Sequence, residues 1–268
     1  MFRPYDARTS ESRRSHVRLV RWTGQFALAR TRWCDRLVYP PGPPDLLTIS
    51  GVSRSYGPVQ ALKPIDLTVT GGQCIAFLGV NGSGKSTLLR IAAGRDTPTS
   101  GQVSYDGLGL REDALVARTE IAVVGDARSA YPDLTVREHL LLVAVAHGGG
   151  KGAPDLVDAA LAECRLSDHA TALPGWLSSG QQQALQLAAV LVRPRRLLIL
   201  DEPEQRLDPA ARRWLAGLLV REKARGVALL LATHHTELAE AVADEAIVLL
   251  DGTVIGRGTP AQTLASGQ

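Results

Sequence analysis

A glycine-rich stretch between two apolar segments constrains this 268-residue chain more than any other feature. Residues 79–86 read GVNGSGKS and match the pattern G-x-x-x-x-G-K-[ST]. They follow the apolar run Cys74–Leu78, an expected strand, and lead into Lys85–Ala93, an expected helix. The glycines let successive backbone N–H groups point inward, and the helix N-terminus adds partial positive charge. The stretch therefore predicts a phosphate-binding loop (P-loop).

The side chains of this loop have separate expected roles. Lys85 should reach the β- and γ-phosphates of a nucleotide as a cation, and the Ser86 hydroxyl should be a ligand to Mg²⁺. The structural alternative is a glycine-rich strand-to-helix turn with a surface lysine, which the full motif in this context disfavours. The residues expected to bind nucleotide here are Gly79, Asn81, Gly82, Ser83, Gly84, Lys85, Ser86 and Thr87.

A second expected strand ends in adjacent carboxylates, within the sequence RRLLILDEP of residues 195–203. In a parallel sheet, ligands bind beyond the carboxyl ends of the strands, so Asp201 can meet the Mg²⁺ that Ser86 holds. Glu202 is then placed to orient or deprotonate an attacking water. A solvated acidic strand end is the alternative, but a Mg–nucleotide site needs an acid at this position.

From residue 46 onward, short β-like runs alternate with helical ones, which indicates an α/β domain with a largely parallel core sheet. Thr135 and Glu138 have the spacing of a capping box that opens the second helix. The expected strands are Leu46–Ile49, Ile65–Val69, Cys74–Leu78, Ile121–Val124, Leu197–Leu200, Ala228–Ala232 and Ala246–Leu250. The expected helices are Lys85–Ala93, Val136–His147, Pro154–Cys164, Gln181–Val192, Ala210–Ala224 and Thr236–Val242.

The charge of the chain is unevenly distributed. Residues 1–44 carry nine Arg against three acids, net +6, and residues 45–268 carry 21 basic against 24 acidic residues, net −3. Residues 39–44 read YPPGPP and break helices. We therefore expect a basic, disordered extension with a Pro-rich linker over 1–44 and one folded domain over 45–268. Attraction of the extension to acidic lipid or nucleic acid is the alternative.

Membrane and redox signals are weak. The longest apolar run, Leu140–Ala146, is far shorter than the roughly 20 residues of a membrane helix. Cys34, Cys74 and Cys164 are odd in number and far apart, which disfavours a disulfide framework and a zinc site. We expect reduced thiols in a cytoplasmic protein, with Cys74 in the core.

The P-loop and the acidic strand leave a small-molecule kinase, a GTPase and a transport ATPase possible, and the order of further motifs separates them. Tyr56 in SRSYG comes first, then the P-loop, then LSSGQ at 177–181, then LDEP at 200–203, then Leu207-Asp208 and Thr233-His234. In this order and spacing, residues 46 to about 262 resemble the ATP-binding subunit of ABC transporters.

This resemblance implies a fold and an assembly. The fold is a P-loop NTPase core with a mostly parallel sheet flanked by helices, an antiparallel β subdomain at the N-terminal side, and an inserted helical subdomain at about 127–178. In this family the LSSGQ segment of one subunit, here Ser178, Gly180 and Gln181, closes over the γ-phosphate held by the P-loop of another. A homodimer, or a heterodimer with a related cassette, would complete two sites. On residues alone, Ser and Gly also favour helix N-termini for capping.

The resemblance also implies roles for single residues. Tyr56 is similar to the aromatic residue that stacks on adenine, although an isolated Tyr is more often a strand packing position. Asp208 resembles a loop residue that crosses to the partner subunit, and it also suits a helix N-cap before Pro209. His234 matches the histidine that contacts the γ-phosphate, and the role of His235 is open.

Three positions depart from the family pattern. Ser179 stands where the family usually has Gly, and Ala184 where it usually has Arg. Asp126 ends the expected strand Ile121–Val124 and its loop where the family usually has Gln. The Asp126 carboxylate can still bind Mg²⁺, directly or through water, and Arg128 could offset its charge. We infer that Mg·ATP binding is retained, and turnover and coupling stay open.

The sequence is interpreted as the ATP-binding and ATP-hydrolysing subunit of an ABC transporter. Lys85, Glu202 and His234 are its expected catalytic residues, ATP and Mg²⁺ its cofactors, and Ser86, Asp201 and Asp126 its expected metal ligands. The partners are a second cassette and a separate membrane permease at the inner face of the membrane, with no nucleic acid. The compact ending after Gly258 favours export, but the cargo is not indicated. The rivals are a P-loop kinase, which needs an acceptor pocket, and an ABC-type regulatory module with weak hydrolysis.

Overall fold

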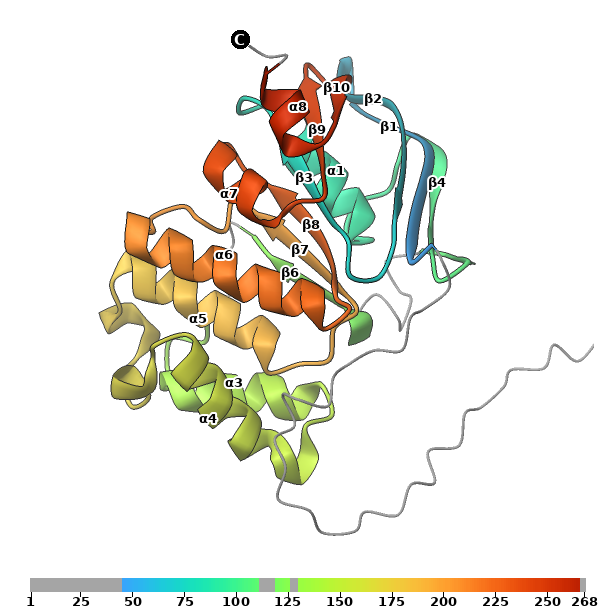
Figure 1. The fold of residues 1–268 in the computed structure, drawn as a ribbon. Coiled ribbons are helices and arrows are strands. Elements are labelled where there is room, and N and C mark those ends of the chain that lie inside the picture. The colour runs from blue at the N-terminus through green and yellow to red at the C-terminus, as the bar shows by residue number, and fades with distance from the viewer. Residues whose placement is uncertain (1–44, 111–118, 126–129, 266–268) are drawn as a thin grey trace, which may run out of the picture. The chain divides into compact units, whose positions relative to one another are not determined.

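The structure is a computed structural model that describes residues 45–110, 119–125 and 130–265. Two β-sheets organise these residues (Figure 1). The larger sheet has six strands in the order β10-β9-β3-β8-β7-β6, and the smaller has four in the order β2-β1-β4-β5. The predicted α/β class, with a mostly parallel core sheet and a separate antiparallel sheet near the N-terminal side, is confirmed.

The larger sheet is parallel except at one edge, where β10 runs antiparallel to β9. Every residue of β3 and of β8 is buried, because sheets covered on both faces need continuous apolar strands. That continuity explains why the parallel strands could be predicted. The strands are β3 (Cys74–Leu78), β6 (Ile121–Val124), β7 (Leu197–Asp201), β8 (Ala228–Ala232), β9 (Glu245–Leu250) and β10 (Thr253–Gly258).

Alternate side chains of the parallel strands point into two different cores. Leu198 and Leu200 of β7 join a core that includes Leu215 of α6 and residues of α3, α4 and α5. Leu197 and Ile199 join a second core with helix α1 and the antiparallel sheet. The parallel sheet is therefore the middle layer, and the carboxyl ends of its strands are held from both faces.

The antiparallel sheet is more extensive than the sequence predicts. Its strands are β1 (Leu47–Tyr56), β2 (Val59–Val69), β4 (Ser100–Tyr105) and β5 (Leu108–Gly109). The expected strands 46–49 and 65–69 cover only part of β1 and β2, and β4, β5 and β10 were not expected. Polar residues alternate with buried ones along these strands, and register shifts such as that between Ile49 and Val52 break the simple period of two.

The helices begin and end within two residues of the predicted bounds, and α8 was not predicted. They are α1 (Lys85–Ala92), α3 (Val136–Ala146), α4 (Ala153–Glu163), α5 (Ser179–Leu191), α6 (Pro209–Ala224), α7 (Thr236–Val242) and α8 (Pro260–Ala265). Short 3-10 segments lie at Gly150–Gly152, Ser167–His169 and Pro174–Trp176.

Helices α3 and α4 lie together on the far side of α5 from the parallel sheet (Figure 1). The predicted capping box is confirmed, because Glu138 N donates to Thr135 Oγ1 at 3.3 Å and Thr135 N donates to Glu138 Oε2 at 2.9 Å. Leu140 is fully buried and belongs to the core that α3 shares with α4 and α5. The helices fall within the segment expected to form the helical subdomain.

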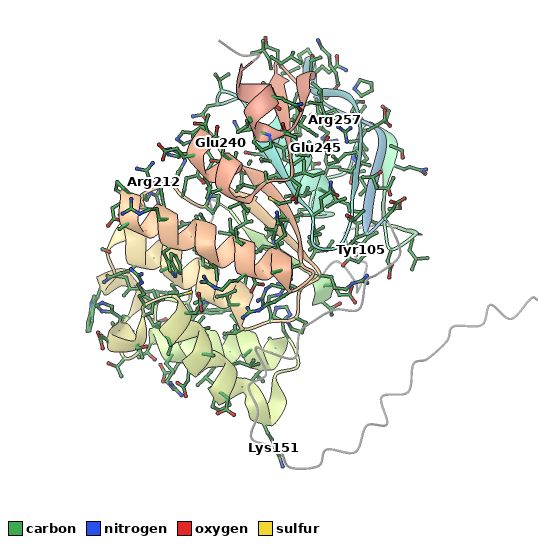
Figure 2. All side chains as sticks on the ribbon, viewed as in Figure 1. Tyr105, Lys151, Arg212, Glu240, Glu245 and Arg257 are labelled. Atoms are coloured by element: carbon green, nitrogen blue, oxygen red, sulfur yellow. The ribbon has the colours of Figure 1, made fainter. Side chains whose placement is uncertain are left out.

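Two ion pairs fasten neighbouring elements. Arg195 and Glu222 are both buried, and Arg195 Nε donates to Glu222 Oε2 at 2.6 Å, which ties the start of β7 to α6. Arg195 Nη1 also donates to the carbonyl of Leu191 at the end of α5, so this cation compensates a helix C-terminus as well. Nearer the surface, Arg257 of β10 donates to Glu245 of β9 (Figure 2).

The two cysteines in the described part of the chain are buried free thiols. Burial raises the pKa of the Cys74 thiol to about 12, so this side chain is a neutral core residue, as predicted. Cys34 and the extension 1–44 lie outside the described residues. Within the described ranges, every helix is too short or too polar to cross a membrane.

Candidate nucleotide-binding site

Close backbone packing shapes the P-loop between β3 and α1. Gly79 has φ 144°, and a Cβ there would lie 2.3 Å from the Leu249 carbonyl oxygen. Gly84 has φ 106°, and a Cβ there would lie 2.8 Å from the Ala61 carbonyl oxygen. Only glycine satisfies both the left-handed φ and these approaches. The loop is also tied to the β9–β10 turn, where Gly252 N donates to the Ser83 carbonyl at 3.0 Å.

Two polar features of the loop suit a phosphate. Gly84 is the N-cap of α1 and provides no side-chain cap, so ligand oxygens can accept from the first N–H groups of this helix. Ser83 is buried, and its Oγ finds no hydrogen-bond partner among the described residues. A buried hydroxyl without a partner is costly unless a ligand satisfies it. The loop therefore fits the polyanion that its sequence predicts.

The Lys85 side chain lies along the loop. Lys85 is 4% exposed, and its Nζ donates to the carbonyls of Gly79 at 2.7 Å and Val80 at 3.0 Å. An ammonium group has three donors, so one remains for a phosphate oxygen. The two carbonyls thus hold the cation in place before any ligand arrives.

A cavity of about 290 Å³ opens in front of the P-loop and brings most of the predicted residues together. Ser86 and Asp201 both line it, although they come from α1 and from the end of β7. Hydroxyl and carboxylate oxygens are ligands that Mg²⁺ prefers, so this donor set fits the ion. Asp126, the third expected ligand, lies outside the described residues, as does Arg128. The lining residues are Ala61, Asn81, Gly82, Gly84, Lys85, Ser86, Thr87, Asp201, Glu202 and Gln205.

Glu202 is held in one orientation at the rim of this cavity. Its backbone is left-handed, with φ 47°, and its N–H donates to the Ala232 carbonyl at 2.9 Å. Gln205 Nε2 donates to Glu202 Oε2 at 2.6 Å, and His234 Nδ1 lies 3.7 Å from the same oxygen. The predicted pair Glu202 and His234 is thus brought together. Gln205 was not predicted, because only the turn geometry reveals that it faces back toward Glu202.

A second acid, Glu204, lies beneath this rim and was also not predicted. It is 1% exposed and accepts a short hydrogen bond from the Thr233 hydroxyl. Burial raises the pKa of its carboxyl group. His235 N donates to Thr233 Oγ1 at 3.0 Å, so Glu204 and Thr233 support the turn that carries both histidines. The sequence does show an acidic residue two positions after Glu202, but nothing in the sequence indicated a role for it.

Tyr56 lies at the end of β1 and is 41% exposed. The Arg54 guanidinium lies 4.5 Å from the ring centroid, and the Tyr56 hydroxyl donates a short hydrogen bond to Asp96. One ring face therefore contacts a cation. Tyr56 is not among the residues that line the cavity of about 290 Å³, and its stacking on adenine stays a prediction.

The LSSGQ segment starts helix α5 outside the cavity that the P-loop lines. Ser178 is the N-cap: Gln181 N donates to Ser178 Oγ at 3.3 Å, and Ser178 N donates to Gln181 Oε1 at 2.8 Å. The helix begins at Ser179, so the expected start near Gln181 was wrong by two residues, because the capping box extends the first turn back to Ser178. Gly180 lies in that turn, where a Cβ would be 3.5 Å from the Arg206 carbonyl oxygen.

Asp208 performs the capping role that its sequence context allows. Ala211 N donates to Asp208 Oδ1 at 2.7 Å, and Pro209 occupies the first turn of α6. The other carboxylate oxygen of Asp208 keeps acceptor capacity.

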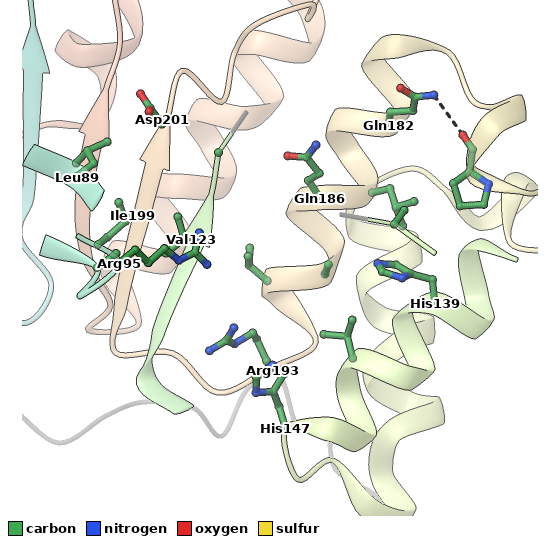
Figure 3. A pocket seen from close by; sticks show the side chains of 18 of the residues that line it. Leu89, Arg95, Val123, His139, His147, Gln182, Gln186, Arg193, Ile199 and Asp201 are labelled. Atoms are coloured by element: carbon green, nitrogen blue, oxygen red, sulfur yellow. Dashed lines mark hydrogen bonds between the residues drawn. The ribbon is translucent and has the colours of Figure 1, made fainter. Parts of the chain in front are cut away.

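A larger cavity of about 720 Å³ separates the core from the helices around α3 and α5 (Figure 3). Ser86 and Asp201 line this cavity as well as the smaller one, so the two spaces meet at the expected metal ligands. Its other wall includes His147 of the α3 C-cap and Arg193. Burial and the neighbouring cation Arg95 lower the pKa of Arg193 to about 10. Burial and Arg193 lower the pKa of His147.

Similarity to known proteins agrees with this geometry. The family model described as ABC transporter matches residues 62–205. The Nod factor export ATP-binding protein I of Rhizobium etli is 34% identical over 215 residues, which are 80% of this chain and 68% of that protein. The protein of the same name from Burkholderia lata is 36% identical over 210 residues, which are 78% of this chain and 69% of that protein.

Solved structures show the same fold. The dimeric structure of MJ0796, a bacterial ABC transporter cassette, is 25% identical with a TM-score of 0.74, covering 80% of this chain and 98% of that one. The structure of cbiO1 from Clostridium perfringens, part of the ABC transporter complex cbiONQ, is 28% identical with a TM-score of 0.74, covering 84% of this chain and 92% of that one. The chain therefore belongs to the ABC transporter family, as an ATP-binding subunit that hydrolyses ATP.

Proposed function

We propose that this subunit binds Mg·ATP in the P-loop cavity, completes the site with a second cassette, and uses hydrolysis to drive export through a separate permease. The observation that carries the proposal is the convergence of Lys85 and Ser86 from the start of α1, and of Asp201 and Glu202 from the end of β7 and the turn after it, on one cavity. A packing explanation does not account for a buried lysine, a hydroxyl and two acids on one open wall.

The phosphates are held by Lys85 and by the loop amides. Glu202 takes the proton from the attacking water, and Gln205 fixes the carboxylate that does so. His234 donates to the charge that develops on the γ-phosphate. Tyr56 offers its open ring face to adenine, while Asn81, Gly82, Ser83 and Thr87 complete the contacts of the loop.

Magnesium would be held by Ser86 and Asp201, with Asp126 as the proposed third ligand. When bound, the ion neutralises charge on the β- and γ-phosphates. Ser86 presents its hydroxyl from the first turn of α1, and Asp201 presents its carboxylate from the end of β7.

The second cassette supplies Ser178, Gly180 and Gln181, and Asp208 lies at the same interface. The Ser178 oxygen already accepts from Gln181 N, but its O–H can still donate to a γ-phosphate held by the other subunit. The position of this segment outside the P-loop cavity of its own chain supports a composite site. Either a second copy of this chain or a related cassette can complete it.

The permease contact is proposed for the helical segment at about 127–178. The larger cavity that borders this segment shares Ser86 and Asp201 with the nucleotide cavity, which supports communication between the two. Tyr131, Val145 and Trp176 are exposed there, as a docking surface requires.

Binding to the permease places the subunit on the cytoplasmic face of the membrane. Export is the proposed direction, because relatives from Rhizobium etli and Burkholderia lata are named for Nod factor export. We propose residues 45–268 as its cassette and 1–44 as a separate basic extension.

The experiment compares ATP turnover of the full chain with that of Glu202→Gln, in the presence of Mg²⁺ and without a phosphate acceptor. The substitution removes the base but keeps the hydrogen-bonding shape, so turnover should fall about 100-fold or more while ATP binding persists. Hydrolysis without an acceptor argues against a kinase. Equal, slow rates in both proteins would instead favour a regulatory module with weak hydrolysis, an alternative that Ser179 and Asp126 support.

A further inference from the structure

Three metal-ligating side chains meet beside the rim of the nucleotide cavity. One ligand atom each from Glu204, His234 and His235 lies within 4.8 Å of the other two. The histidine rings are tilted against each other, with centroids 4.3 Å apart. Glu204 precedes α6, and the histidines lie in the turn between β8 and α7, so the fold brings together residues 30 positions apart.

Glu204 is the unusual member of this group. It is 1% exposed, and one carboxylate oxygen accepts from Thr233, but Oε2 is buried and finds no hydrogen-bond partner among the described residues. Leaving a buried carboxylate oxygen without a partner costs stability. An acceptor with no donor, next to two imidazoles, indicates an atom suited to a cation.

Arg212 on α6 supplies the competing interaction (Figure 2). Its Nη1 lies 3.1 Å from His235 Nδ1. A guanidinium only donates, so the lone pair of His235 Nδ1 accepts from Arg212, which also adds a positive charge nearby. A metal ion at Nδ1 would have to displace Arg212, and a metal ion at Nε2 would require the other tautomer of the ring, which can no longer accept from Arg212.

We propose that Glu204, His234 and His235 form a binding site for a divalent transition metal such as Zn²⁺. Two imidazoles and one carboxylate are a known zinc ligand set that leaves a fourth position for water. Imidazole ligands also select such metals over Mg²⁺, which prefers oxygen ligands only. The site is thus chemically distinct from the oxygen site of Ser86 and Asp201.

Occupation of this site would inhibit ATP turnover. A metal held by His234 takes this side chain away from the γ-phosphate and places it against Glu204 instead. This consequence depends on the role proposed above for His234, whereas metal binding itself does not. A subunit with such a site would lower its hydrolysis when free transition metal rises.

The test measures Zn²⁺ binding to the full chain without nucleotide, in excess Mg²⁺, by competition with a chromophoric zinc indicator. Glu204→Gln removes the anionic oxygen with little change of shape, and His235→Ala removes an imidazole. Each should weaken binding by at least about tenfold, since even outer-shell changes cost roughly 10–100-fold. Arg212→Ala should tighten it. His147→Ala, which removes a histidine of the other cavity, is the matched control and should leave binding unchanged.

Turnover gives a second readout. Zn²⁺ should inhibit the parent at concentrations that match its binding, and His235→Ala should resist inhibition. Equal zinc affinity of the parent, Glu204→Gln and His235→Ala would overturn the proposal. The zinc titration decides the inference even if the parent hydrolyses no ATP, so failure of the site and failure of the proposed function can be distinguished.

Discussion

Two glycine-containing turns lead into helices in this subunit, and they differ in how their polar groups are satisfied. The P-loop turn enters α1 with Gly84 as an N-cap that offers no side chain, a buried Lys85 and an open cavity. The LSSGQ turn enters α5 with a complete capping box made by Ser178 and Gln181, outside that cavity. The first turn leaves its N–H groups for a ligand, whereas in the second the capping box satisfies the N–H groups of Ser178 and Gln181.

The contrast supports the proposal that two chains form each site. A loop that binds a triphosphate must keep donors and a cation in reserve, and only close packing can hold it in shape. A loop that closes over a phosphate held elsewhere can be stable by itself until the partner arrives. In the proposed assembly, the two turns are complementary parts of one site and are contributed by different subunits.

The largest effect is expected at the P-loop lysine. Lys85→Ala removes the buried cation that is proposed to bind phosphate, and losing one partner of such a pair costs about 2–5 kcal/mol, or roughly 30- to 4000-fold in Kd. Titration with a fluorescent ATP analogue measures the loss. Lys151→Ala, which removes an exposed lysine far along the chain, should bind as the parent does. Equal affinities of the two variants would show that the lysine does not hold phosphate.

The next effect separates packing from conformation in the same loop. Gly79→Ala adds a Cβ that would lie 2.3 Å from the Leu249 carbonyl, whereas a Cβ at Gly82 has nothing within 4 Å. Both residues have positive φ, so both substitutions carry strain of about 1 kcal/mol or more. Gly79→Ala should therefore lower the free energy of unfolding and ATP affinity more than Gly82→Ala does. Chemical denaturation measures the free energy of unfolding of both variants. Equal losses would show that the approach of a Cβ at residue 79 to the Leu249 carbonyl is unimportant.

A smaller effect distinguishes the two roles of Ser178. Ser178→Ala loses the cap of α5, which costs about 1 kcal/mol of stability, and also the hydroxyl donor. Ser178→Asp keeps a capping oxygen but places a negative charge toward phosphate. The free energy of unfolding of Ser178→Asp should be close to that of the parent. ATP-dependent dimerisation should be weakened in both Ser178→Ala and Ser178→Asp. If Ser178→Asp dimerises as the parent does, Ser178 acts only as the N-cap of α5.

The smallest effect is in pH dependence. Burial raises the pKa of Glu204 above its ordinary value near 4.5. The unfolded chain therefore releases this proton at lower pH than the folded chain, so the contribution of Glu204 to stability is present below about pH 4.5 and is lost as pH rises through the folded pKa. The stability of Glu204→Gln relative to the parent should rise over that window. Urea unfolding at several pH values tests this, and a flat difference would contradict it.

Sequence patterns predicted those parts of the fold that depend on continuous signals. The strand Cys74–Leu78 is apolar throughout, and the caps Thr135 and Asp208 have local partners, so each could be found in one segment. The ends of β1 and β2 were missed, because polar residues and register shifts interrupt their pattern.

Site residues followed the same rule. The P-loop, Asp201 and Glu202 were predicted from motifs that are compact in sequence, and His234 was predicted from the family resemblance. Gln205 and Glu204 were not, since their importance comes from a turn that directs one back to Glu202 and the other onto Thr233. Contacts between separate motifs require the folded chain.

The composite site is tested most directly by the mass of Glu202→Gln in solution. Multi-angle light scattering with Mg·ATP, in the presence and absence of the membrane permease, should show a doubling of cassette mass that the double variant Lys85→Ala/Glu202→Gln does not show. If Glu202→Gln binds ATP yet remains a single cassette under both conditions, the serine-bearing turn of one subunit does not close over the phosphate of another.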